Sequence, residues 1–242
     1  GFAVGWLVGL TGVGGGSLMT PILLLVFNVK AAVAVGTDLL FASLTKSVGI
    51  IAHRKLGNID WRMVATLAIG SVPASLITSW YLGAFGVDSE SLVKQIRFWL
   101  GVALLLTSIS VLYRQELLSS VKHESYLRPA LITPVTILLG ILLGIMVTLT
   151  SVGAGALGVT ALLLLYPTTP INRIVGSDVA HAVPITLIAG LGHASLGTVD
   201  YSLLGTLLIG SIPGIWIGSH MTAVINENWV RIVLAAILVY VG

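Results

Sequence analysis

The feature that most limits how this chain can fold is an internal repeat. Residues 36–73 align without a gap to residues 176–213 at a constant offset of 140, and thirteen of the thirty-eight positions are identical. The identical pairs are Gly36/Gly176, Asp38/Asp178, Ala42/Ala182, His53/His193, Leu56/Leu196, Gly57/Gly197, Asp60/Asp200, Thr66/Thr206, Leu67/Leu207, Ile69/Ile209, Gly70/Gly210, Ser71/Ser211 and Pro73/Pro213. Upstream the offset becomes 139, so that residues 13–16 fall on residues 152–155. Similarity at this spacing predicts two copies of one structural unit.

The environment of the two copies follows from composition. Apolar residues make up 56% of the chain and charged residues 9%, with a mean hydropathy of +1.05, whereas soluble domains carry about 25% charged residues. Strand-period alternation is absent, and most apolar stretches reach the ~20 residues that cross a bilayer as a helix. The stretches cover about residues 1–27, 31–52, 63–87, 95–113, 130–166, 174–195, 202–225 and 229–242.

These patterns predict the fold class: an all-α, polytopic integral membrane helical bundle of two homologous repeats. We assign the repeats to residues 1–113 and 129–242, with a polar connector at residues 114–128. Residue 1 aligns with Gly140, so we expect the chain as given to start within a helix. The twelve Lys and Arg residues stand at segment ends, too evenly distributed to orient the protein, and no basic groove for nucleic acid accompanies them. The absence of Cys excludes thiolate catalysis.

One apolar stretch, residues 131–166, is too long for a single straight crossing. Thirty-six helical residues would measure about 54 Å against a hydrocarbon core of ~30 Å. The glycine-rich segment 150–155 must therefore redirect the chain, either by kinking a tilted helix or by forming the tip of a shorter re-entrant arm. We thus predict that the first helix of each repeat is glycine-broken or re-entrant. Whether this segment is a kinked crossing helix or a re-entrant arm decides whether the repeats are parallel or inverted, and the sequence favours neither.

Glycine breaks occupy matching positions in the two copies, at residues 12–16 and 153–155. The first break differs from a nucleotide-binding loop, because no Gly-Lys-Ser/Thr sequence follows it and no strand precedes it. In a bilayer, unwound backbone needs other groups or cavity water to satisfy its N–H and C=O groups. Two such breaks predict a shared cavity, where helix N-termini direct partial positive charge toward an anion. Close packing of small residues between helices is the alternative.

The second helix of each copy carries charges in apolar surroundings. Asp38 and Lys46 lie there in the first copy, and each would cost roughly 2.5–3.5 kcal/mol or more if it faced lipid. At 100° per residue they share one stripe about 100° wide, which we expect to face the bundle interior. The second copy keeps the acid as Asp178, adds His181 and has Thr186 in place of Lys46. One cation therefore breaks the symmetry of the predicted site.

Different interpretations of these charges remain open. Asp38 and Lys46 are eight residues apart, about 12 Å along a helix, so a structural ion pair of Lys46 would have to form with Asp178 across the copies. In the functional interpretation, Lys46 faces a transported anion, while Asp38, Asp178 or His181 takes up a proton. A metal held by Asp178 and His181 is disfavoured because no third ligand is near. We predict neither a metal nor a cofactor.

Two further pairs of equivalent residues have structural interpretations. Asp60 and Asp200 each precede a long apolar run, where a carboxylate accepts hydrogen bonds from the first free N–H groups of a helix. We predict that both residues are helix caps. His53 and His193 stand at the ends of the second helices and are interpreted as interfacial residues.

Taken in order, the first-copy motifs resemble those of the sulfite exporter TauE/SafE family of bacterial multi-pass membrane permeases. The matching segments are Gly12-Val13-Gly14-Gly15-Gly16-Ser17-Leu18-Met19-Thr20-Pro21, Ala34-Val35-Gly36-Thr37-Asp38, Gly57-Asn58-Ile59-Asp60-Trp61 and Gly70-Ser71-Val72-Pro73. The second copy departs from this pattern, with Gly153-Ala154-Gly155 for the triplet and Thr160 for the proline. The order and duplication of the motifs carry the resemblance.

The resemblance implies a secondary transporter of the bacterial cell inner membrane that moves sulfite, an organosulfonate or a related small anion, with the proton as candidate coupling ion. An anion channel and an intramembrane hydrolase built on Asp38 and Asp178 are the alternatives. We expect a small anionic solute and the lipid bilayer as partners, no enzymatic activity and no nucleic acid, and we leave the oligomeric state open. The candidate substrate-binding residues are Gly14, Gly15, Gly16, Ser17, Thr20, Thr45, Lys46, Gly153, Gly155 and Thr186. The candidates for proton coupling are Asp38, Asp178 and His181.

Overall fold

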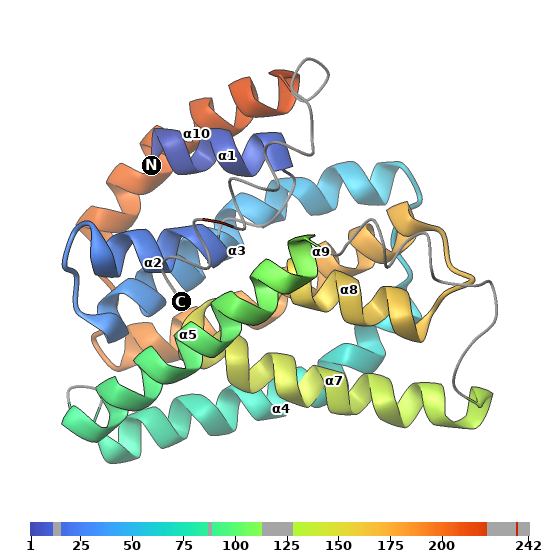
Figure 1. The fold of residues 1–242 in the computed structure, drawn as a ribbon, viewed down its shortest axis with the longest axis horizontal. Coiled ribbons are helices and arrows are strands. Elements are labelled where there is room, and N and C mark those ends of the chain that lie inside the picture. Colours follow the sequence, from blue (N-terminus) through green and yellow to red (C-terminus); the bar gives the residue numbers. More distant parts are fainter. Residues whose placement is uncertain (12–15, 87–88, 113–127, 222–235, 237–242) are drawn as a thin grey trace.

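The computed structural model describes residues 1–11, 16–86, 89–112, 128–221 and 236, which form helices and no strand (Figure 1). The predicted all-α class is confirmed. The connector up to residue 127 and most of the last predicted stretch lie outside the described residues. The first-half helices are α1 (Phe2–Thr11), α2 (Gly16–Leu25), α3 (Ala31–Lys55), α4 (Trp61–Phe85) and α5 (Glu90–Leu112). The second-half helices are α7 (Pro129–Thr150), α8 (Ala156–Leu165), α9 (Ile171–Ser195) and α10 (Tyr201–Met221).

Six of the described helices are long and apolar enough to cross a membrane, namely α3, α4, α5, α7, α9 and α10. The ten-residue helices α2 and α8 extend only about 15 Å each, half of the hydrocarbon core. Large apolar side chains such as Ile69, Trp80 and Ile209 are exposed on the long helices, as contact with lipid requires. The chain is therefore a multi-pass membrane protein in which some helices only enter the bundle.

The segment between α7 and α8 turns the chain back on itself. Thr136 Oγ1 near the start of α7 and Tyr166 Oη at the end of α8 are 2.8 Å apart, so α8 returns along α7 (Figure 1). Ser151 has a φ of 59°, and Gly153 and Gly155 have φ values of 130° and 132°. The last two conformations favour glycine, which explains the glycines of this break. Of the two predicted alternatives, the structure has the re-entrant arm.

Helices α3 and α9 cross each other in opposite directions. Gly36, early in α3, lies against His193 near the end of α9, and Gly176, early in α9, lies against His53 near the end of α3. A side chain at either glycine would collide with backbone of the other half. The two helices that align in the sequence therefore run antiparallel, which is the arrangement that inverted repeats would require.

The outer helices of the two halves are exchanged. α7 packs along α4, and α1 packs along α10, as Figure 1 also shows. Gly140 of α7 lies against the Leu67 carbonyl of α4, and Gly1, just before α1, lies against the Leu207 carbonyl of α10. Leu67 and Leu207 are equivalent at the offset of 140. Small residues let these backbones approach closely, so each half holds an outer helix of the other.

Reciprocal hydrogen bonds fix the turns after α3 and α9. The Asp60 amide donates to Ser177 Oγ of α9 at 2.8 Å, and the Asp200 amide donates to Thr37 Oγ1 of α3 at 3.0 Å. The carboxylates of Asp60 and Asp200 also accept hydrogen bonds from amides in the first turns of α4 and α10. The predicted caps are therefore confirmed, and each cap is anchored to the opposite half.

Thr37→Val is expected to destabilise the protein by about 1 kcal/mol, because it leaves the Asp200 amide without its acceptor while keeping the shape of the side chain. Thermal unfolding of the purified protein in detergent measures the change. Thr206→Val is the matched control, since the exposed Thr206 hydroxyl donates only to a carbonyl of its own helix. Equal losses in the two variants would contradict the anchoring role.

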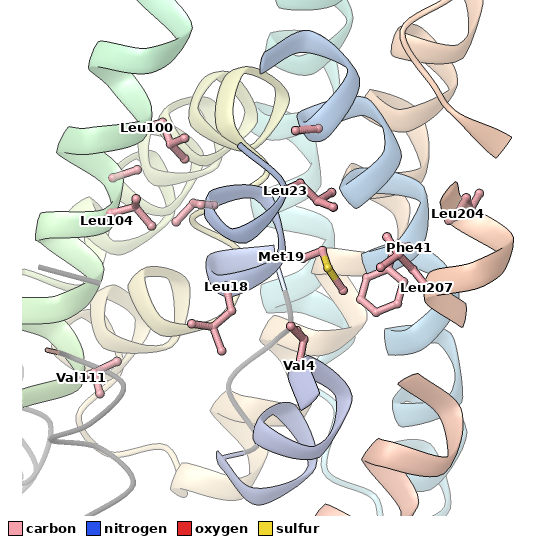
Figure 2. Close-up of a cluster of buried hydrophobic side chains, with 13 residues drawn as sticks. Val4, Leu18, Met19, Leu23, Phe41, Leu100, Leu104, Val111, Leu204 and Leu207 are labelled. Atoms are coloured by element: carbon pink, nitrogen blue, oxygen red, sulfur yellow. The ribbon is translucent and has the colours of Figure 1, made fainter. Parts of the chain in front are cut away.

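One apolar cluster surrounds the short helix α2. Figure 2 shows Leu18, Met19 and Leu23 of α2 between Phe41 of α3 and Leu104 of α5, and all five side chains are buried. A helix of ten residues is too short to be stable through its own hydrogen bonds, so burial of these side chains holds it in place. α2 is thereby fixed beside α3, with its first turn next to the first glycine break.

Candidate functional site

Asp38 of α3 is fully buried and joined to α2. Thr20 Oγ1 donates to Asp38 Oδ2 at 2.6 Å. The second carboxyl oxygen, Oδ1, is buried without a hydrogen-bond partner in the part of the chain that the structure describes. Ser151, at the end of α7, places its buried hydroxyl close to this carboxyl group without a well-formed hydrogen bond to it. Asp38 thus lies between the short helix of the first half and the break of the second.

Lys46 of α3 reaches into the break between α7 and α8. Its Nζ donates to the Ala154 carbonyl at 2.8 Å. Within the described ranges no ion pair of 4.0 Å or less joins Lys46 to a carboxylate. Asp178 and Asp38 are nevertheless near enough to interact with its charge, Asp178 more strongly. The direct Lys46–Asp178 pair considered from the sequence is absent, because an unwound peptide offers a carbonyl that no helix satisfies.

Asp178 of α9 lies against the first turn of α8. Its Oδ1 is so close to Gly158 that any side chain at position 158 would collide with it. Within the described residues this buried oxygen has no hydrogen-bond partner. The N–H groups at a helix N-terminus stabilise a nearby carboxylate. The carboxyl group of Asp178 therefore lies where the α8 N-terminus can stabilise it.

His181 of α9 is tied to α4. Its Nε2 and Ser71 Oγ are 2.8 Å apart, and both residues are fully buried. Its Nδ1 is buried without a partner among the described residues. Lys46 is near enough to His181 for their charges to interact. The described residues include no group of three or more His, Asp or Glu side chains that could hold a metal ion.

The remaining predicted hydroxyl groups belong to equivalent regions of α3 and α9. Thr45 Oγ1 donates to the Phe41 carbonyl at 2.8 Å, and Thr186 Oγ1 donates to the Ala182 carbonyl at 2.7 Å. Both hydroxyl protons are thus used within their own helices. Thr186 is fully buried and Thr45 is half-buried beside Lys46.

The predicted glycines are divided between the two breaks. Gly153 and Gly155 shape the tip of the α7–α8 arm through their positive φ angles. Gly16 and Ser17 are the first residues of α2. Gly14 and Gly15 lie outside the described residues. The structure therefore brings together Thr20, Asp38, Lys46, Asp178, His181 and the second break.

Sequence reasoning missed three groups at this site. These are the Ser151 hydroxyl, the Ala154 carbonyl and the Ser71 hydroxyl. Ser151 stands beside the predicted glycine break, and this position was a weak indication that the residue would lie near Asp38. Ser71 contacts His181 only because α4 packs on α9, and no pattern within either segment indicates that contact.

The interfacial interpretation of His193 is wrong. The side chain is fully buried, with Nδ1 2.8 Å from Thr198 Oγ1 and Nε2 3.0 Å from the Thr148 carbonyl. α7 covers this end of α9, and the histidine satisfies polar groups of both α7 and the following turn. His53, its equivalent, is half-buried.

The fold and the buried charges define a class of protein: a multi-pass α-helical membrane protein with a re-entrant arm and a polar centre between two halves. The family model described as sulfite exporter TauE/SafE matches residues 1–242. The chain belongs to this family and is a membrane transporter. The resemblance in the sequence motifs is thus confirmed over the whole chain.

Curated relatives from bacteria and archaea match the full length. The probable membrane transporter protein YjnA of Bacillus subtilis is 38% identical over 244 residues, covering 100% of this chain and 95% of the relative. The probable membrane transporter proteins YunE of Bacillus subtilis and MJ0441 of Methanocaldococcus jannaschii are 31% and 28% identical, covering 100% of this chain and 93% and 91% of themselves. No solved structure matches the chain.

Proposed function

We propose that the chain is a secondary transporter that moves a small sulfur-containing oxyanion, such as sulfite or an organosulfonate, across the bacterial cytoplasmic membrane. The observation that carries this proposal is the hydrogen bond from Lys46 to the Ala154 carbonyl. It holds an ammonium group at an unwound segment inside the bundle, between the two halves. An ammonium has three N–H donors, and oxyanions are bound most strongly by charged donors.

Substrate binding is proposed to exchange one oxygen partner of Lys46 for another. The Ala154 carbonyl carries only a partial charge, so an anion that enters the break is the stronger acceptor for the ammonium. The displaced peptide would then be free to change conformation, which couples binding to movement of the arm. The other proposed substrate-binding groups are the amides of Gly14, Gly15, Gly16, Gly153 and Gly155 and the hydroxyl groups of Ser17, Thr20, Thr45 and Thr186. The three threonines would have to exchange their present acceptors for the substrate.

Coupling to protons is the second part of the proposal. Asp38, Asp178 and His181 are buried around Lys46, and each has one side-chain atom without a partner among the described residues. Uptake of a proton by any of them would change the charge that the substrate meets. Side chains of this kind inside a membrane commonly form proton relays. The proposal assigns them to transport, with no catalytic residue.

Counterflow into proteoliposomes tests the proposed function. Vesicles containing the purified protein and loaded with unlabelled sulfite or an organosulfonate should transiently accumulate the labelled compound, with a rate that saturates as its concentration rises. Equal uptake by protein-free vesicles would refute transport of that anion. A flux that fails to saturate would instead indicate an anion channel.

A further inference from the structure

The charges at the centre of the bundle do not balance. Asp38 and Asp178 provide two carboxylates, and Lys46 is the ammonium that interacts with both. By formal charge, one carboxylate more than the single ammonium is therefore present among the described side chains at this centre. An unmatched buried charge is costly in a membrane protein, and such residues commonly mark ion pathways.

The surroundings of Asp38 supply oxygen atoms on more than one side. Thr20 donates its hydroxyl proton to Oδ2, which leaves Oδ1 as an acceptor with no protein donor among the described residues. Ser151 lies close by and is only 4% exposed. Its hydroxyl likewise has no hydrogen-bond partner in the described ranges. Backbone carbonyls of the unwound segment after α7 adjoin Ser151. Carboxylate, hydroxyl and unwound carbonyl oxygens are the ligands that Na⁺ takes in transporters with broken helices.

We propose that Asp38 Oδ1 and Ser151 Oγ form a binding site for one sodium ion at the tip of the re-entrant arm. The proposal rests on the transport function proposed above and names Na⁺ as a coupling ion for it. A monovalent cation fits because it supplies the single positive charge that Lys46 leaves missing. No described group of three His, Asp or Glu side chains is present to favour a divalent metal.

The site occurs once among the described residues, because the equivalent positions of the opposite halves lack its hydroxyl groups. At the upstream offset of 139, the counterpart of Thr20 is Val159, and the counterpart of Ser151 is Gly12. Asp178 consequently lacks the hydroxyl that orients Asp38, and it faces the α8 N-terminus instead. One sodium ion, rather than two, is therefore expected for each chain.

Sodium binding can be measured without any substrate. The purified protein in detergent is titrated with NaCl at constant ionic strength, with choline chloride as the balancing salt, and thermal unfolding is followed through tryptophan fluorescence. Na⁺ should raise the unfolding midpoint in a saturable manner, whereas KCl should have a much smaller effect, because a bound ligand stabilises only the state it fits. Binding of ²²Na⁺ at constant temperature gives the stoichiometry independently of unfolding.

Two variants locate the site. Ser151→Ala should weaken the apparent Na⁺ affinity about tenfold, since it removes one ligand, and Asp38→Asn should abolish binding. Ser195→Ala is the matched control, because this serine is exposed and its hydroxyl donates to the Gly192 carbonyl of its own helix. Identical midpoints in Na⁺, K⁺ and choline, or unchanged ²²Na⁺ binding in Asp38→Asn, would overturn the proposal.

The two proposals can fail separately. Saturable counterflow in sodium-free buffer by a protein that binds no ²²Na⁺ would leave the transport function standing and refute the sodium site, with a proton as the remaining coupling ion. Stoichiometric ²²Na⁺ binding that is lost in Asp38→Asn, without counterflow of any sulfur oxyanion, would support the sodium site and refute the proposed substrate class.

Discussion

Lys46→Met is expected to slow counterflow of sulfite or organosulfonate about ten- to hundredfold. Methionine keeps the length and apolar stem of lysine but removes the ammonium, the cation that interacts with both Asp38 and Asp178. A hydrogen bond to a charged group contributes about 1.5–3 kcal/mol, and each 1.4 kcal/mol changes an equilibrium constant tenfold. An anion would also enter beside two carboxylates with no compensating charge. Initial rates in proteoliposomes measure the effect.

Lys94→Met is the matched control for this substitution. Lys94 is exposed on α5 and pairs with Glu90 at 2.7 Å on the same helix, so its loss should leave counterflow unchanged. Thermal unfolding of both variants separates loss of transport from loss of folded protein. Full transport activity in folded Lys46→Met would show that the substrate does not depend on this ammonium and would remove the main support for the anion site.

Gly140→Ala is expected to destabilise the protein by about 1–3 kcal/mol, the usual cost of overpacking a tight contact. The added methyl group would run into the Leu67 carbonyl, where α7 and α4 lie together, and backbone cannot move aside as a flexible side chain can. A lower midpoint of thermal unfolding in detergent measures the effect. Retention of the wild-type midpoint would mean that the two helices can separate without cost.

Gly205→Ala provides the comparison. Gly205 is a helical glycine of α10, and a methyl group there meets open space. Since alanine has the higher helix propensity by about 1 kcal/mol, this variant should be neutral or slightly stabilised. Equal destabilisation of both variants would indicate a general effect of glycine replacement rather than a specific contact between α4 and α7.

Sequence patterns that span a few residues were sufficient to predict much of the fold. The apolar stretches predicted the long helices, and the acids ahead of two of them predicted the caps that Asp60 and Asp200 form. The helical stripe predicted that Asp38, Asp178 and His181 point inward, and all three are buried. These features depend on residues a few positions apart along one segment, so the sequence contains the needed information.

Other parts of the site depend on contacts between distant segments. The partner of Lys46 is a backbone carbonyl 108 positions away, and a carbonyl leaves no mark in the residue type. Thr20 reaches Asp38 because the α2 helix packs beside α3, and Ser151 comes near because α8 turns back. His193 is buried by α7, which nothing around position 193 could indicate.

By itself, the sequence determined that the chain is a membrane-spanning helical protein, where α4 and α10 begin, and that Asp38, Asp178 and His181 face inward, because hydrophobic periodicity and capping act over a few residues. Only the tertiary structure decided that α8 is re-entrant, that α3 and α9 run antiparallel, and that Lys46 bonds to a peptide carbonyl instead of a carboxylate. Those outcomes depend on how the two halves pack, where close backbone contacts at glycines compete with the need to satisfy every buried polar group.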